Sequence, residues 1–293
     1  MRALFCAILL FPLVLNAQAH KSRKSKISTK SGTLFLSYGL NSSFFSKSKI
    51  DFIGTGYDFT LTGVKGKDQP IFRGEGLKQF NTRLGYTFTD AFAISVGIDH
   101  MKYGISDGQT VLLNGKLNGG VDPVTGLSGS YFNEAFTIDT AKFNYAYQGL
   151  NFINLKISRL DRIFWVGKYN DFTLTSDFGC LAGLLASSVN YNFAGNSDFK
   201  TSSLSGVGIA AYAGLRFEFL RHFFIQTGFS VGYMRQLNVR VLESNPNAYN
   251  RQSMAYGQME TTFGCLFYIR PKNDCNSCPS WGYSFPPARK SIL

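Results

Sequence analysis

The chain has 293 residues and a formal net charge of +12, with 16% charged and 15% aromatic residues. Because a soluble domain typically carries about 25% charged residues, this composition argues against an ordinary water-soluble protein. Residues 32–270 contain no interdomain linker and no change in residue composition, so we expect them to form one domain.

The N-terminal residues have the features of a secretory signal peptide. Arg2 supplies a positive charge, residues 6–15 form an apolar run, and Ala17-Gln18-Ala19 is a small-x-small cleavage site. We expect residues 1–19 to be removed, which leaves a basic arm at residues 20–31. A basic arm binds lipid headgroups or nucleic acid in some proteins. Export argues against nucleic acid, and a solvated tether is the simpler interpretation.

Regular alternation predicts an all-β chain that closes into an antiparallel transmembrane β-barrel of about ten strands, with a range of eight to twelve. We expect short turns at Gln148-Gly149 and at Leu160-Asp161. Ten strands require the second turn, and eight would follow without the two strands that flank it. Twelve would follow if residues 49–64 entered the barrel instead of forming a hairpin above the membrane. The expected strands are residues 32–45, 77–88, 91–103, 132–148, 150–159, 162–168, 172–190, 206–220, 223–243 and 254–270.

The hairpin at 206–233 shows the alternation most clearly. Apolar side chains take every second position from Val207 to Phe219, and the pattern resumes after Arg221 and His222. Successive strand side chains point to opposite faces, so the hairpin has one apolar and one polar face. The polar face is mostly small and uncharged. A barrel whose outside contacts lipid and whose lumen is crowded has this combination.

The connections alternate between short and long. The turns at Thr89-Asp90 and Arg221-His222 are short, whereas residues 46–76 and a Gly- and Asn-rich loop at 106–130 are long. Bacterial barrels have short periplasmic turns and longer extracellular loops. The competing architecture is a secreted β-sandwich, but a sandwich with so few outward charges would be poorly soluble.

Four short motifs resemble one protein family. They are GYDFT at 56–60, GIDHMKY at 97–103, GLNF at 149–152 and RHFFIQTGFSVGY at 221–233. They are similar to motifs of an outer-membrane β-barrel family common in Bacteroidota, most of whose members are uncharacterised. The resemblance implies an outer-membrane location in a Gram-negative bacterium and a closed barrel. It implies no catalytic residue.

The chain has three histidines as candidate general bases. His20 lies in the basic arm and His222 in an expected periplasmic turn, which leaves His100 as the catalytic candidate of a lipid-modifying hydrolase. Ser106 is a nearby nucleophile in sequence, but alternation directs Asp99 inward and His100 outward. We therefore favour a noncatalytic barrel with a structural, surface-binding or narrow-pore role, and interpret His100 as an interfacial side chain.

Charged residues on the expected lumen face form the second candidate site. Both signs occur there in nearly equal number, and buried charges persist when they are paired. A salt-bridged plug is the favoured interpretation, and a ligand or ion pathway is the alternative. The expected lumen charges are Arg83, Asp99, Lys142, Lys156, Asp177, Arg216, Glu218 and Glu260.

The C-terminal residues 271–293 form an expected periplasmic tail with a CxxC motif at Cys275 and Cys278. An oxidising compartment favours a local disulfide, which we expect to contact a periplasmic partner. Cys180 and Cys265 fall on outward faces of the barrel. No metal or cofactor is expected, because no further ligands lie near the CxxC motif. The expected partners are outer-membrane lipid and the barrel-assembly machinery, and the oligomeric state stays open.

Overall fold

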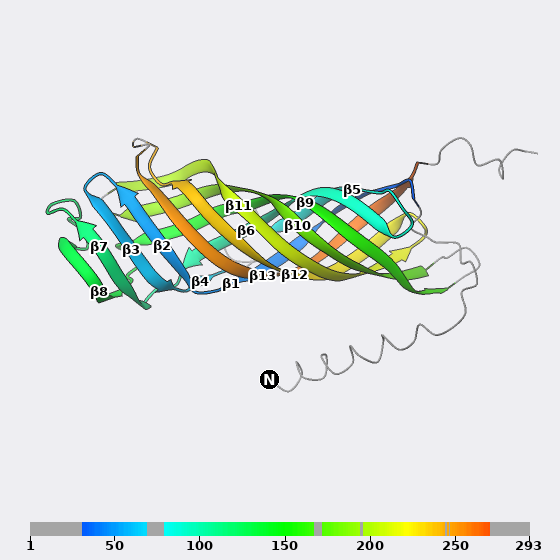
Figure 1. Cartoon of the computed structure of the whole chain (residues 1–293), viewed down its shortest axis with the longest axis horizontal. Helices are drawn as coiled ribbons and strands as arrows, with labels where there is room; N and C mark the ends of the chain where they lie inside the picture. The colour runs from blue at the N-terminus through cyan, green and yellow to red at the C-terminus, as the bar shows by residue number, and fades with distance from the viewer. Residues whose placement is uncertain are drawn as a thin grey trace, which may run out of the picture.

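The computed structural model describes residues 31–68, 79–166, 172–193, 196–243, 245 and 247–269. The regular structure of these residues is β-sheet, and eight antiparallel strands close into a barrel (Figure 1). The ring closes because β1 pairs with β5 on one side and with β13 on the other. Around the ring, the strands are β1 (Thr33–Phe45), β5 (Phe80–Thr87), β6 (Phe92–Ile105), β9 (Asn144–Val166), β10 (Phe172–Phe193), β11 (Asn196–Phe219), β12 (Phe223–Arg240) and β13 (Tyr249–Tyr268).

The ring confirms the predicted fold class, and its eight strands lie at the lower end of the expected range. Two expected turns are absent, because β9 runs without interruption from 144 to 166. At the first, Gln148 is the extra residue of a β-bulge opposite β10, so the strand bends without reversing. At the second, Leu160 and Asp161 pair in register with β10.

Four further strands form a sheet at one end of the barrel, which we call the head sheet. They are β2 (Ser48–Gly54), β3 (Tyr57–Val64), β7 (Thr110–Leu117) and β8 (Gly129–Thr137). The first residues of β13, 249–253, pair with β2, so the head sheet continues the barrel wall (Figure 1). The hairpin at 49–64 therefore lies outside the ring as predicted, whereas the expected loop at 106–130 contains β7. A two-residue strand β4 (Gly66–Lys67) pairs with β6.

Three ring strands are much longer than a membrane requires. β9, β10 and β11 have 23, 22 and 24 residues, whereas a tilted strand crosses the hydrocarbon core with about 9–11 residues. The same strands therefore build the lipid-facing wall and, beyond it, the support of the head sheet.

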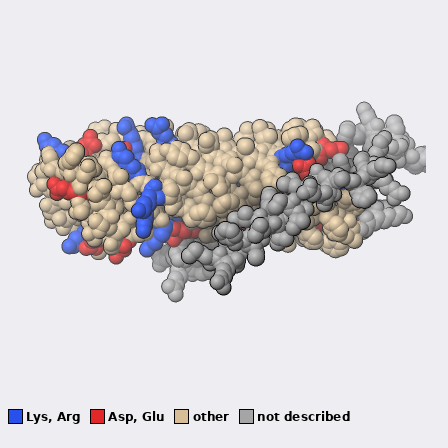
Figure 2. Space-filling model, turned by 60° about the horizontal axis from the view of Figure 1, so that its bottom comes forward, with Lys and Arg blue, Asp and Glu red and all other residues tan. Residues whose placement is uncertain are grey.

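Apolar side chains cover the outside of the ring. On the face shown in Figure 2, an uncharged band separates the charged residues at the head from a charged group nearer the other end. On β12 the outward residues from Ile225 to Tyr233 are uncharged, and Arg235 is the first charge on that face. Stacked phenylalanine pairs, including Phe172–Phe217 and Phe223–Phe263, lie near the turn end of the band. A barrel presents such a band to lipid, so this barrel is transmembrane.

The short turns and the ends of the described chain lie opposite the head. The turn between β11 and β12 contains His222, as predicted, and Leu220 and Arg221 adopt positive φ angles of 49° and 64° there. The backbone N–H of Leu266 donates to the His222 carbonyl at 2.7 Å, which fixes this turn against β13. No helix in the described ranges is long and apolar enough to span a membrane.

Candidate functional site

Side chains fill the interior of the barrel in three layers, because alternation directs every second residue of each ring strand inward. The layer nearest the short turns is the apolar floor, which consists of Phe35, Ala93, Leu160, Phe224 and Leu266. The ionic layer follows, and above it an aromatic cap fills the long-strand end. The largest fully buried side chains of the cap are Tyr103, Tyr145, Tyr147, Tyr191, Phe52, Phe59, Phe143, Phe152 and Phe193.

Seven of the eight expected lumen charges lie inside the barrel. Six of them form the ionic layer, and the seventh, Glu218, is buried beside Phe224 of the floor. The six are Arg83, Asp99, Lys156, Asp177, Arg216 and Glu260. The eighth expectation was wrong. Lys142 lies in the turn before β9, is 58% exposed at its side chain and contacts Asp139 at 3.8 Å. The alternation does not extend to this position, because the Asp139 side chain and carbonyl accept hydrogen bonds from the backbone of Ala141, Lys142 and Phe143.

One half of the ionic layer is centred on Asp99. Its carboxylate accepts hydrogen bonds from Asn81 Nδ2 at 2.7 Å and Asn154 Nδ2 at 2.8 Å, and Arg83 Nη2 lies 3.4 Å away. Arg83 Nη1 also donates to the side-chain Oδ1 of Asn154 at 3.0 Å. Asn81 donates in addition to Glu260 Oε2 at 2.9 Å, so strands β5, β6, β9 and β13 are joined through one network.

The other half is centred on Asp177. Its Oδ2 accepts from Lys156 Nζ at 2.7 Å and from Gln226 Nε2 at 2.9 Å. Lys156 Nζ also lies 3.4 Å above the centre of the Tyr212 ring, a cation–π contact. Arg216 donates from Nε to Gln226 Oε1 at 2.8 Å, and its guanidinium faces the Phe35 and Phe224 rings of the floor. Each cation therefore has a partner in the low-dielectric interior.

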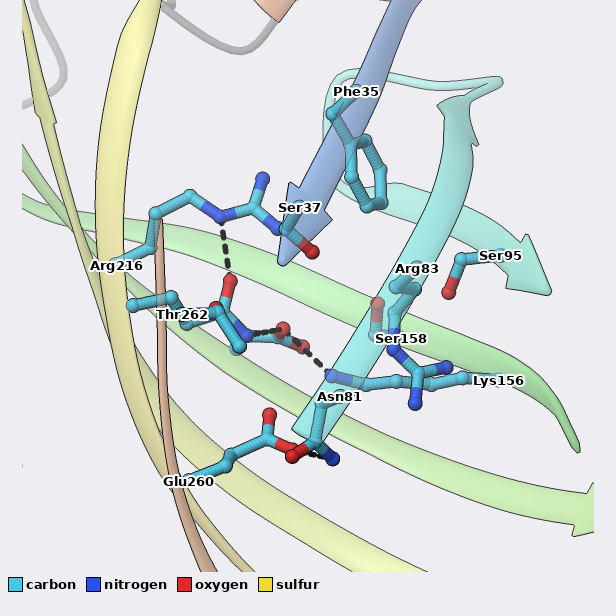
Figure 3. A pocket seen from close by; sticks show the side chains of 12 residues that line it. Phe35, Ser37, Asn81, Arg83, Ser95, Lys156, Ser158, Arg216, Glu260 and Thr262 are labelled. Atoms are coloured by element: carbon cyan, nitrogen blue, oxygen red, sulfur yellow. Dashed lines mark hydrogen bonds and ion pairs between the residues drawn. The ribbon is translucent and has the colours of Figure 1, made fainter. Parts of the chain in front are cut away.

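The two halves enclose a cavity of about 10 Å³, which is the space that one water molecule requires. Figure 3 shows Arg83 and Lys156 reaching it from one side, and Arg216 and Glu260 from the other. Asp177 Oδ1 and Arg216 Nη1 are buried without a hydrogen-bond partner in the described structure. A single water molecule in the cavity would satisfy such atoms, but a solute or a row of hydrated ions does not fit.

The aromatic cap joins the head to the barrel. Phe52 of β2 stacks on Phe59 of β3 with ring centres 4.9 Å apart, and both rings are buried. A chain of hydrogen bonds runs from Tyr147 Oη to Gln252 Oε1 at 3.0 Å, and from Gln252 Nε2 to Ser48 Oγ at 3.0 Å. It connects β9, β13 and β2, so the long-strand end of the lumen is packed like a protein core.

Sequence reasoning missed the residues that complete these layers. Asn81, Asn154 and Gln226 occupy inward positions and hold the carboxylates, and their alternation with outward apolar residues was a signal that could have found them. The cap was missed because its inward aromatic residues recur at every second strand position. Lipid-facing residues recur in the same way, so the two cannot be distinguished in the sequence.

The catalytic candidate His100 is buried on the outward side of β6. Its ring stacks on Phe80 with centres 5.1 Å apart, and Nδ1 is 2.7 Å from Asn151 Oδ1. In the part of the chain that the structure describes, no hydrogen bond links His100 to Asp99 or Ser106, and Asp99 faces the lumen. The structure therefore does not bring the three candidate groups of a hydrolase together.

The remaining candidates divide between described and undescribed residues. Cys180 and Cys265 are free thiols on nonadjacent strands. Among the described residues no group of three or more His, Cys, Asp and Glu side chains has the geometry to hold a metal ion. The signal peptide, the basic arm up to residue 30, and the Cys275–Cys278 motif lie outside the described residues.

The fold and the filled lumen define a class: a closed eight-stranded transmembrane β-barrel with a folded head. No family model and no curated protein sequence matches the chain. Solved structures similar to it include Ail, the attachment invasion locus protein of Yersinia pestis, at 12% identity and a TM-score of 0.32, covering 81% of this chain and 99% of that one.

Two further structures are outer-membrane proteins of other organisms. OprG from Pseudomonas aeruginosa has 12% identity and a TM-score of 0.38, and covers 83% of this chain and 100% of that one. The outer membrane protease OmpT from Escherichia coli has 8% identity and a TM-score of 0.34, and covers 85% and 100%. At these values the similarity does not assign a function to this chain.

Proposed function

We propose that the chain is a noncatalytic outer-membrane β-barrel whose barrel anchors the head, and that the head acts in binding at the cell surface. One observation carries this proposal: the charged centre of the lumen leaves a cavity of only about 10 Å³. A pore-forming barrel needs a continuous water-filled lumen, whereas this one is filled from floor to cap.

The lumen charges act in this proposal as a closed plug. The support is their pairing, because Lys156, Asp177 and Asp99 each contact at least two polar or aromatic partners. An ion pathway would instead need exchangeable charges next to continuous water.

The head is the element left for recognition. β8 ends the head sheet and pairs only with β7 among the described strands, and Phe132 on it is 84% exposed. A strand edge and a bare aromatic ring are surfaces to which other molecules bind. Glu134 adds an exposed charge to β8.

Conductance in planar lipid bilayers tests the plug. The refolded chain is expected to insert without opening steady channels, because no continuous water path crosses the ionic layer. A variant that replaces both Lys156 and Asp177 by alanine removes the central pair and serves as a positive comparison. Steady ohmic channels from the unaltered chain would overturn the proposal.

A lipid-modifying hydrolase that uses His100 is the alternative function. It requires the ring to leave its contacts with Phe80 and Asn151 during the reaction. Lipid analysis of a strain that lacks the gene tests it: altered lipid acylation that the intact gene restores and a His100→Ala copy does not would favour the hydrolase.

We further infer export by the signal peptide of residues 1–19, insertion by the barrel-assembly machinery, and a location in the outer membrane of a Gram-negative bacterium. The long-strand end with the head then faces the outside. Membership of the Bacteroidota-type family rests on the four sequence motifs, and a periplasmic partner of the tail rests on the CxxC motif at Cys275 and Cys278. An epitope inserted at residues 118–121 tests the orientation, because antibodies should detect it on the surface of intact cells.

A further inference from the structure

Three basic side chains lie together where the lipid-facing band meets the head. They are Lys49 of β2, Arg235 of β12 and Arg251 of β13, and all three are exposed. Arg235 and Lys49 pair with the same residue, Ser253, from opposite sides. Arg251 is two positions from Ser253 on the same strand and therefore on the same outer face. We call these three residues the basic cluster.

Neutralising partners around the basic cluster are few. Lys49 Nζ lies 3.3 Å from Asp51 Oδ1, in a pair whose lysine side chain is 62% exposed. Among the described residues, Arg235 and Arg251 take part in no ion pair. The Arg251 guanidinium lies over the Tyr249 ring at 5.2 Å and donates to its hydroxyl at 3.2 Å, which holds it at the surface. Asp51 is also the cross-strand neighbour of Arg251, so one carboxylate lies beside three cations and the cluster keeps a net positive charge.

An exposed apolar surface lies directly below the basic cluster. Tyr233 is next to Arg235 on the outer face of β12, and further down Phe44 stacks on Phe229 with ring centres 5.7 Å apart. Ser253 of β13 lies between Arg235 and Lys49, so no long side chain separates these two cations. A ligand with an anionic group and hydrocarbon chains would fit this site, because a positive surface lies directly above an apolar one.

We propose that the basic cluster binds the phosphate group of a phosphorylated membrane lipid in the leaflet that borders the head, with its acyl chains against Phe44 and Phe229. This inference rests on the proposed outer-membrane location. Two guanidinium groups and an ammonium supply charge-assisted hydrogen bonds to phosphate oxygens, and arginine matches phosphate geometry best. The simpler explanation is that each basic side chain only extends into water at the membrane interface, which a single residue does without basic neighbours. The grouping argues against it, because three strands place their cations around one residue, Ser253.

The test compares lipid binding by the full refolded chain. Native mass spectrometry measures the fraction of barrels that carry bis-phosphorylated lipid A, its dephosphorylated form, or inorganic phosphate. We expect bound bis-phosphorylated lipid on the unaltered chain and about a fivefold loss of affinity for each cation removed, in Arg235→Gln, Arg251→Gln and their double variant. Lys116→Gln, on the exposed face of β7, is the matched control and should bind like the unaltered chain.

Two results would overturn the inference: equal binding of the phosphorylated and dephosphorylated lipids, or an equal loss in Lys116→Gln and in the double variant. Binding of inorganic phosphate as strong as that of the lipid would also contradict it, because the apolar surface would then contribute nothing. Restoration of binding by Arg235→Lys together with Arg251→Lys would support a charge-based site. None of these results depends on conductance. If the lipid-binding inference is wrong, the proposals that the lumen is plugged and that the head binds at the surface still stand.

Discussion

Lys156 Nζ lies 2.7 Å from Asp177 Oδ2 at the centre of the barrel, and their side chains are only 3% and 2% exposed. The two residues are on neighbouring strands, β9 and β10, but are offset along them, since Lys156 pairs with Leu181 and Asp177 with Leu160. The lysine therefore reaches along the lumen to its partner, and the contact closes the space that a pore would need.

Removal of one member of this pair should destabilise the barrel strongly. Asp177→Leu leaves the Lys156 ammonium buried without its partner, which typically costs about 3–5 kcal/mol. The double variant Lys156→Met with Asp177→Leu should recover most of this loss, because no buried charge is then left without a partner. Urea unfolding in detergent, followed by the heat-dependent gel shift of the folded barrel, measures the change. Arg159→Met, which breaks the exposed pair with Asp161 at 2.8 Å, is the control and should cost about 1 kcal/mol or less.

Truncation of Phe52 should loosen the head while leaving the barrel folded. Phe52→Ala removes a fully buried ring that stacks on Phe59, and such truncations cost about 3–5 kcal/mol. Hydrogen exchange should rise in β2, β3 and β7 with little change in β10 and β11 near the floor. Leu112→Ala, on the exposed face of β7, should leave exchange unaltered. Equal loosening of head and floor would show that the two fold as one unit.

Acid should loosen the turn before β9. The backbone N–H and the hydroxyl of Thr140 donate to the Asp107 carboxylate at 2.8 and 2.9 Å, which lowers the pKa of Asp107 below its ordinary value. Since the folded-state pKa is the lower one, the contribution to stability is fully present above the unfolded-state pKa and is lost as the pH falls through the folded-state value. Exchange of the Thr140 amide should therefore rise on acidification in the unaltered chain, and be faster but independent of pH in Asp107→Asn after correction for intrinsic exchange.

Substitution of His100 should affect stability and leave lipid composition unchanged. His100→Ala removes the hydrogen bond to Asn151 and the stacking on Phe80, each worth about 1 kcal/mol. The matched variant Asn151→Ala should lower stability by a similar amount, because it removes the same hydrogen bond. Loss of a lipid-modifying activity in His100→Ala at normal barrel abundance would contradict this expectation.

The alternation of side chains was sufficient to predict the wall of the barrel and most of its lumen charges. Arg216 and Glu218 face inward beside Leu215 and Phe217, which face outward, because strand geometry leaves each residue only two directions. The same rule placed Asp99 in the lumen and His100 outside. It failed at Lys142, where Asp139 forms a local turn, and at Gln148-Gly149, where a bulge and a turn have the same residue preferences.

The sequence by itself determined that this chain forms a closed β-barrel with an apolar outside and charges inside, because a period of two is a local property that each strand carries alone. Only the tertiary structure decided how the lumen is used. Whether Lys156 meets Asp177 depends on the register between β9 and β10, and whether Phe52 packs into the barrel mouth depends on β13 pairing with both β1 and β2. These are contacts between distant segments, and no local pattern of residues specifies them.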